Sequence, residues 1–97
     1  MIAVKEGVTL VGVQPVMYFA ALVFWQVFGE CTITSGTDPA PGRVANSLHR
    51  LGYAIDVRLP QRSEFVVNGP ERLASQLGEH FDVVWTDTHV HIEYDPR

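Results

Sequence analysis

The longest run of hydrophobic residues in the chain covers residues 16–28, where only Gln26 is polar. Its 13 residues fall short of the roughly 20 that a membrane-spanning helix needs. Pro15 is typical of the first position of a helix, and Gly29 is typical of the position after its end. The pattern therefore predicts a buried core helix and no membrane span. It also predicts that the aromatic residues of this run lie in the core, namely Phe19, Phe24, Trp25 and Phe28.

Four shorter segments have the composition or the alternation of β-strands. Short stretches rich in β-branched residues, and stretches in which apolar and polar residues alternate, are typical of strands. These segments cover residues 31–35, 53–59, 81–85 and 88–94. Pro60 ends the second segment, and a tight bend around Thr86 and Asp87 joins the last two.

A second helix is predicted from about residue 68 to residue 80. Pro70 and Glu71 suit its first turn, and an apolar stripe follows at helical spacing through Leu73, Ala74 and Leu77. Together, these elements predict a single α+β domain over residues 1–97. Two helices are expected to pack on one face of a small antiparallel sheet.

Polar and hydrophobic residues alternate in the last predicted strand. Because side chains two positions apart in a strand share a face, we expect Val90 and Ile92 to face the helices. The polar residues should then lie together on the open face of the sheet. They are Asp87, His89, His91 and Glu93.

Two further polar residues come before or within the predicted strand 53–59. His49 falls at the end of the loop that leads into it, and Asp56 lies inside it, where an unpaired buried carboxylate would be costly. If this strand neighbours the last one, His49, Asp56 and His91 converge on the open face. Two imidazoles, one carboxylate and an open coordination position are the composition of a catalytic zinc site. We therefore expect Zn²⁺ as the cofactor.

The composition limits which partners, cross-links and cellular location are expected. The formal net charge is −4 and the seven basic residues are scattered, so nucleic acid is not an expected partner. Cys31 is the only cysteine, which excludes an intramolecular disulfide and a cysteine-rich zinc site. Only Lys5 precedes the apolar run as a positive charge, and no small-residue cleavage pattern follows the run. We expect no export signal and a chain that is cytoplasmic when made.

Residues 47–56 read Ser-Leu-His-Arg-Leu-Gly-Tyr-Ala-Ile-Asp, and His89-Val-His91 follows later. The pattern Ser-x-His-x-x-Gly-x-Ala-x-Asp with a later His-x-His resembles the superfamily of D-alanyl-D-alanine metallopeptidases and the hedgehog signalling domain, which includes many bacteriophage peptidoglycan peptidases. The resemblance covers roughly residues 32–95. It implies a zinc-dependent carboxypeptidase or endopeptidase that hydrolyses peptidoglycan stem peptides containing D-amino acids, and that is released by phage lysis or carried on a virion.

The resemblance also implies roles for individual residues. His49, Asp56 and His91 would be the zinc ligands. Ser47 would support the loop near the substrate, and His89 would line the site beside the third ligand, where it could stabilise the oxyanion.

Two features of the superfamily pattern are missing here. Its members usually carry Ser-Gly-x-Arg after the strand 31–35, with an arginine that positions the substrate carboxylate, whereas this chain continues Ser-Gly-Thr-Asp. Arg43 is the nearest replacement. An acidic residue usually stands a few positions before the last ligand and accepts a proton from water. Asp87 is our candidate for this general base, and Glu93 is a second candidate on the same face.

Two other functions are compatible with the same residues. A non-catalytic relative would bind zinc for stability or recognise peptide or glycan, which the missing arginine favours. An iron oxygenase also uses two histidines and a carboxylate, but that class usually spaces its first two ligands as His-x-Asp, whereas six residues separate His49 from Asp56. We expect the protein to be a monomer or a weak homo-oligomer.

Overall fold

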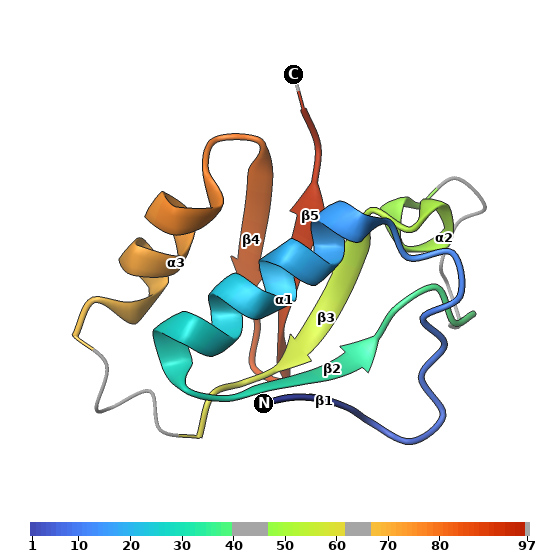
Figure 1. Ribbon diagram of the computed structural model, residues 1–97, viewed down its shortest axis with the longest axis horizontal. Coiled ribbons are helices and arrows are strands. Elements are labelled where there is room, and N and C mark those ends of the chain that lie inside the picture. Colours follow the sequence, from blue (N-terminus) through green and yellow to red (C-terminus); the bar gives the residue numbers. More distant parts are fainter. Residues whose placement is uncertain (40–46, 62–66, 97) are drawn as a thin grey trace.

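The computed structural model describes residues 1–39, 47–61 and 67–96. In these segments the chain forms an α+β fold with a five-stranded sheet and three helices (Figure 1). The elements, in chain order, are β1 (Ile2–Val4), α1 (Pro15–Phe28), β2 (Cys31–Ser35), α2 (Leu48–Leu51), β3 (Ala54–Arg58), α3 (Gly69–Leu77), β4 (Phe81–Trp85) and β5 (His89–Tyr94).

The sheet has the strand order β1-β2-β3-β5-β4, and it is mixed rather than purely antiparallel. β1 pairs with β2 in parallel, whereas β2 with β3, β3 with β5 and β4 with β5 are antiparallel. The prediction of an antiparallel sheet was wrong at this edge. β1 is only three residues long and all three are exposed, so it has no alternation to detect. Because α1 connects β1 to β2, it supplies the crossover that a parallel pair requires.

Helix α1 forms where the sequence predicts it. Pro15 opens the helix, and Gly29 follows it in the left-handed conformation, with φ 75°, and donates its N–H to the carbonyl of Trp25. Phe24 and Phe28 are buried, as expected, and the half-buried Trp25 packs against the core, but Phe19 is 47% exposed. The aromatic prediction was wrong at Phe19 because a helix that is apolar all round does not reveal which side faces the core.

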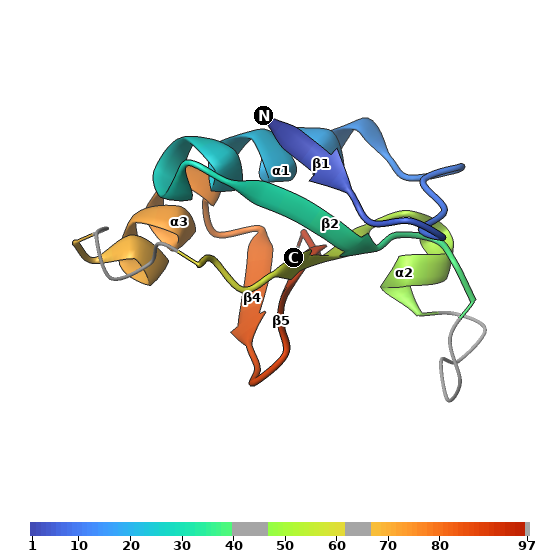
Figure 2. The same cartoon turned by 90° about the horizontal axis from the view of Figure 1, so that it is seen from below.

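The core joins side chains of α1 and α3 to the inward-facing residues of β2, β3 and β5. In β5, Val90 and Ile92 are fully buried, whereas the alternate residues are partly exposed, which confirms the predicted alternation. Figure 2 shows α1 running along β2 while the β4–β5 hairpin extends away from it. Among the described segments, no helix is both long and apolar enough to cross a membrane.

A short helix that the sequence did not predict carries His49. The hydroxyl of Ser47 accepts a hydrogen bond from the N–H of Arg50 and caps the start of α2. Gly52 ends the helix in the left-handed conformation, with φ 85°. A side chain at Gly52 would overlap the carbonyl oxygen of Gly12, and the Gly52 carbonyl accepts a hydrogen bond from Gln14. His49 therefore lies in a capped helical turn rather than at the end of a loop.

Candidate metal centre

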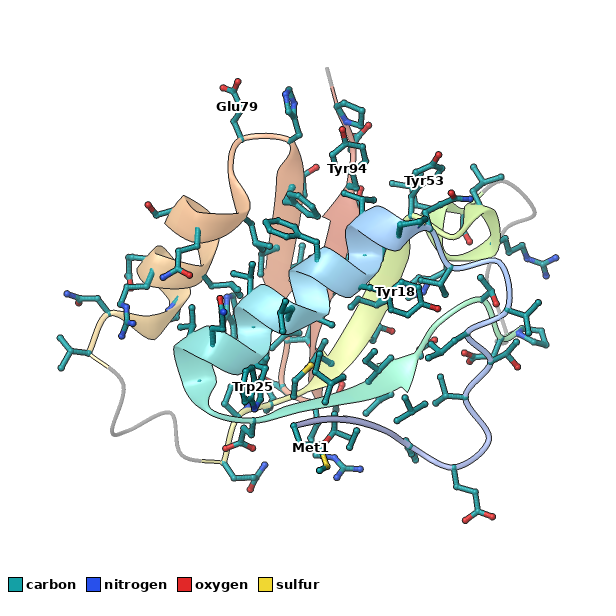
Figure 3. All side chains as sticks on the ribbon, in the orientation of Figure 1. Met1, Tyr18, Trp25, Tyr53, Glu79 and Tyr94 are labelled. Carbon is teal, nitrogen blue, oxygen red and sulfur yellow. The ribbon has the colours of Figure 1, made fainter. Side chains whose placement is uncertain are left out.

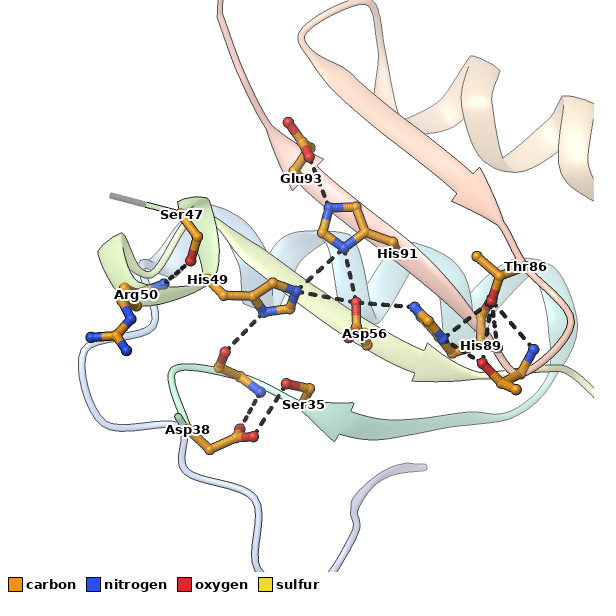
Figure 4. Close-up of polar contacts among 12 residues, drawn as sticks. Ser35, Asp38, Ser47, His49, Arg50, Asp56, Thr86, His89, His91 and Glu93 are labelled. Carbon is orange, nitrogen blue, oxygen red and sulfur yellow. Dashed lines mark hydrogen bonds and ion pairs between the residues drawn. The ribbon is translucent and has the colours of Figure 1, made fainter. Parts of the chain in front are cut away.

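Three side chains from α2, β3 and β5 meet on the face of the sheet that carries the polar residues (Figure 4). The register pairs Asp56 directly with His91, and His49 reaches the same point from α2. Oδ1 of Asp56 lies 2.9 Å from Nδ1 of His91 and 3.2 Å from Nε2 of His49. The two ring nitrogens are 3.3 Å apart. The three atoms thus form a compact triangle, which we call the His-Asp-His group.

Each histidine of the group is held by its other ring nitrogen. Nδ1 of His49 lies 2.9 Å from the carbonyl oxygen of Gly36, and Nε2 of His91 lies 2.8 Å from Oε1 of Glu93. A carbonyl and a carboxylate only accept hydrogen bonds, so both of these nitrogens donate. In the neutral rings, the two nitrogens that face Asp56 are therefore unprotonated and present lone pairs.

This arrangement fits a metal ion. Three lone-pair donors at such short distances repel one another unless a proton or a cation lies between them. In a tetrahedral zinc site with bonds of about 2.0–2.1 Å, neighbouring ligand atoms lie about 3.3 Å apart. The three observed distances are 2.9, 3.2 and 3.3 Å. A backbone carbonyl and a carboxylate are also the usual outer partners of metal-ligating histidines. The group could therefore hold a metal ion.

The charges of the group depend on one another. Burial alone would raise the pKa of Asp56, but the rings of His49 and His91, which donate to its carboxylate when they are protonated, outweigh burial and hold this pKa far below its usual range. The hydrogen bond to Asp56 raises the pKa of His91 above 6.5, against the opposing effect of burial and with further help from Glu93. Without a metal, a proton on His91 is thus favoured in the place that a cation would fill.

His89 lies beside the group, as the sequence predicts, but outside the triangle. Its Nε2 is 3.8 Å from Oδ1 of Asp56. Its Nδ1 is 2.8 Å from the hydroxyl of Thr88 and 3.2 Å from that of Thr86. The hydroxyl of Thr86 also donates to the carbonyl of His89, so the end of the hairpin fixes the ring at the edge of the site.

The other predicted site residues fall in different places. Asp87 is exposed in the bend between β4 and β5, and it makes no hydrogen bond or ion pair with any described residue of the His-Asp-His group. Ser47 is the N-cap residue of α2, two positions before His49. Glu93 is bound to His91. Arg43 lies outside the described residues.

Sequence reasoning missed the anchor of His49. The side chain of Asp38 accepts a 2.7 Å hydrogen bond from the N–H of Gly36 and a 3.3 Å bond from the hydroxyl of Ser35. This turn holds the Gly36 carbonyl against His49. The sequence carried no clear signal for this turn, because an aspartate side chain typically bonds to the backbone two residues after it, whereas Asp38 bonds to the N–H two residues before it. The sequence likewise does not show which backbone carbonyl will meet His49.

Two further features adjoin the group. The carboxylates of Asp82, Glu93 and Asp95 come within 4.8 Å of one another, and Glu93 is also the partner of His91. A cavity of about 290 Å³ lies between α2 and the end of β5, where the rings of Tyr53 and Tyr94 neighbour each other (Figure 3). It is lined by Leu48, Leu51, Tyr53, Tyr94, Asp95 and Pro96 and contains none of the three candidate ligands.

Comparison with known proteins adds no family assignment, since no family model and no curated protein matches the chain.

Proposed function

We propose that the protein is a zinc-dependent metallopeptidase that hydrolyses peptidoglycan stem peptides containing D-amino acids. The single observation that carries the proposal is the His-Asp-His group, in which His49, Asp56 and His91 converge and both histidines are anchored by their outer nitrogens. Three protein ligands leave one tetrahedral position for water or substrate, as catalytic zinc sites do.

The substrate class rests on the resemblance of residues 47–56 and 89–91 to the metallopeptidase superfamily. The structure gives this motif a physical basis. Ser47 and Gly52 cap the helical turn that presents His49, and Asp56 follows in the neighbouring strand. A cell-wall substrate would require release by phage lysis or delivery on a virion.

The chain's own residues support hydrolysis in defined ways. Zinc, when bound, activates water and polarises the scissile carbonyl. His89 lies at the rim with Nε2 turned toward the group, where it can donate a hydrogen bond to a developing oxyanion. Asp87 stays our candidate for the general base, and in this role the bend that carries it would have to approach the water.

The test is hydrolysis of a purified muropeptide by the zinc-loaded protein. We expect turnover that is lost on chelation and in His49→Ala. His80→Ala is the matched control, because His80 is an exposed histidine outside the group. A zinc-loaded protein that leaves every stem peptide intact would contradict the peptidase proposal.

A second candidate is a non-catalytic relative that binds zinc and recognises peptide or glycan. It is favoured by one observation: the expected base, Asp87, makes no contact with the group, and the acid that does, Glu93, is bound to His91. Asp87→Ala separates the two candidates. An enzyme that uses this base would lose turnover and keep its zinc, whereas a binding protein would be unaffected.

A further inference from the structure

The polar face of the sheet carries its charges in a definite order. Along β3, side chains alternate, so Arg58 lies on the same face as Asp56. Across the sheet, Arg58 pairs with His89 and Asp56 pairs with His91. The His-Asp-His group therefore has a cation next to it at the end of the sheet where β3 finishes.

The opposite end of this face is acidic. Glu93 follows His91 by two residues on β5, and Asp82 pairs with Glu93 from β4. Their carboxylates and that of Asp95 lie within 4.8 Å of one another. An anionic group of a ligand is repelled from this end and attracted to the end with Arg58.

The guanidinium group of Arg58 is also available to bind a ligand. Arg58 is exposed, and its side chain makes no hydrogen bond and no ion pair with any described residue. Asp56, two residues earlier, is by contrast surrounded by three histidines. A guanidinium group with all its donors available can hold a carboxylate through two parallel hydrogen bonds.

From this order of charges, and resting on the proposed function, we infer that Arg58 binds the free C-terminal carboxylate of the peptide substrate and makes the enzyme a carboxypeptidase. Two residues along a strand span about 6.6 Å. A terminal carboxylate one residue beyond a scissile carbonyl, about 3.8 Å further along the peptide, falls within that span. Arg58, and not Arg43, would thus take the place of the arginine that positions the substrate carboxylate in the superfamily pattern.

The test uses the zinc-loaded protein and two probes that contain no scissile peptide bond, D-alanine and D-alaninamide. Binding is followed by chemical-shift changes in ¹⁵N-labelled protein, so it does not depend on turnover. We expect the acid to bind about ten- to a hundredfold more tightly than the amide, as a charged hydrogen-bonded pair would give. In Arg58→Gln this preference should vanish, whereas Arg58→Lys should keep part of it.

Arg72→Gln is the matched control, since Arg72 is an exposed arginine on α3, outside this face. It should keep the full preference for the acid. Zinc content and circular dichroism are measured for each variant to show that the site and the fold are intact. Equal binding of acid and amide by the natural protein, or a preference that persists in Arg58→Gln, would overturn the inference while leaving the proposed function standing. A folded natural protein that takes up no zinc would instead overturn the proposed function.

Discussion

At the scale of single residues, the site depends on which ring nitrogen carries a proton. Gly36 and Glu93 accept hydrogen bonds from the outer nitrogens of His49 and His91, and so they turn both lone pairs toward Asp56. The three candidate ligand atoms are therefore held facing one another by the protein's own hydrogen bonds. Preorganisation of this kind reduces the cost of ordering the ligands on binding.

Glu93 should matter for metal affinity even though it is not one of the three ligands. Glu93→Gln removes the negative charge that fixes the tautomer of His91. We expect zinc affinity to fall about 10–100-fold, the usual effect of losing an outer-shell partner. Competition against a fluorescent chelator measures this affinity. Glu79→Gln, at an exposed acid outside the site, should leave it unchanged. Unaltered affinity in Glu93→Gln would show that the hydrogen bond has no role in metal binding.

At the scale of elements, the site is a junction between α2 and the central strands. The Ser-x-His-x-x-Gly part of the motif is a complete capped turn, with Ser47 at its start and Gly52 at its end. Gly52 also packs its backbone against Gly12 in the segment before α1. The position of His49 is therefore fixed from both ends of α2.

The close approach of Gly52 to Gly12 predicts that Gly52→Ala lowers the free energy of unfolding far more than Gly29→Ala does. Both glycines end a helix in the left-handed conformation, with φ 85° and 75°, so both substitutions incur backbone strain of about 1–2 kcal/mol. Only at Gly52 would the new methyl group also overlap a backbone oxygen, whereas nothing lies within 4 Å at Gly29. Urea unfolding should show a larger loss of stability for Gly52→Ala, and zinc affinity should fall in that variant alone. Equal effects on stability would refute this account of the motif.

The sequence predicted those elements in which apolar residues follow a clear repeating pattern. The alternation in β5 and the capped apolar run of α1 were visible because each repeats over several residues. β1 and α2, with three and four residues, are too short for any period. The three candidate ligands were found because their spacing forms a motif. The Gly36 carbonyl could not be predicted as the partner of His49, since every residue has a carbonyl and only the fold determines which one lies beside the ring.

At the scale of the whole molecule, a metal ion would tie together segments that are far apart in the sequence. His91 follows Asp56 by 35 residues and His49 by 42. At a free zinc concentration about 100 times Kd, binding would add about 2.7 kcal/mol of stability. For a chain of this size, that corresponds to a rise in Tm on the order of 10–20 °C.

The pH dependence of stability should have opposite signs with and without zinc. In the metal-free protein the pKa of His91 is raised, so its contribution is fully present below pH 6.5 and is lost as the pH rises through the raised value. Asp56 stays ionised throughout, because its pKa is lowered. Zinc must displace the proton from His91, so the stabilisation by zinc grows as the pH rises.

Thermal unfolding between about pH 6 and pH 8 checks this prediction. The contribution of His91 should appear as a metal-free Tm that falls with pH more steeply in the natural protein than in His91→Ala. The increase in Tm on adding zinc should be larger at pH 8 than at pH 6. An increase that is the same at both values would mean that no histidine proton is displaced.

The most direct test of the central claim is the zinc content of the protein purified without added metal, compared with His91→Ala and His80→Ala. We predict about one zinc per chain in the natural protein and in His80→Ala, and almost none in His91→Ala, which lacks one of three ligands. A folded natural protein that contains no zinc and takes up none when it is added, or a His91→Ala variant that keeps the full amount, would contradict the account.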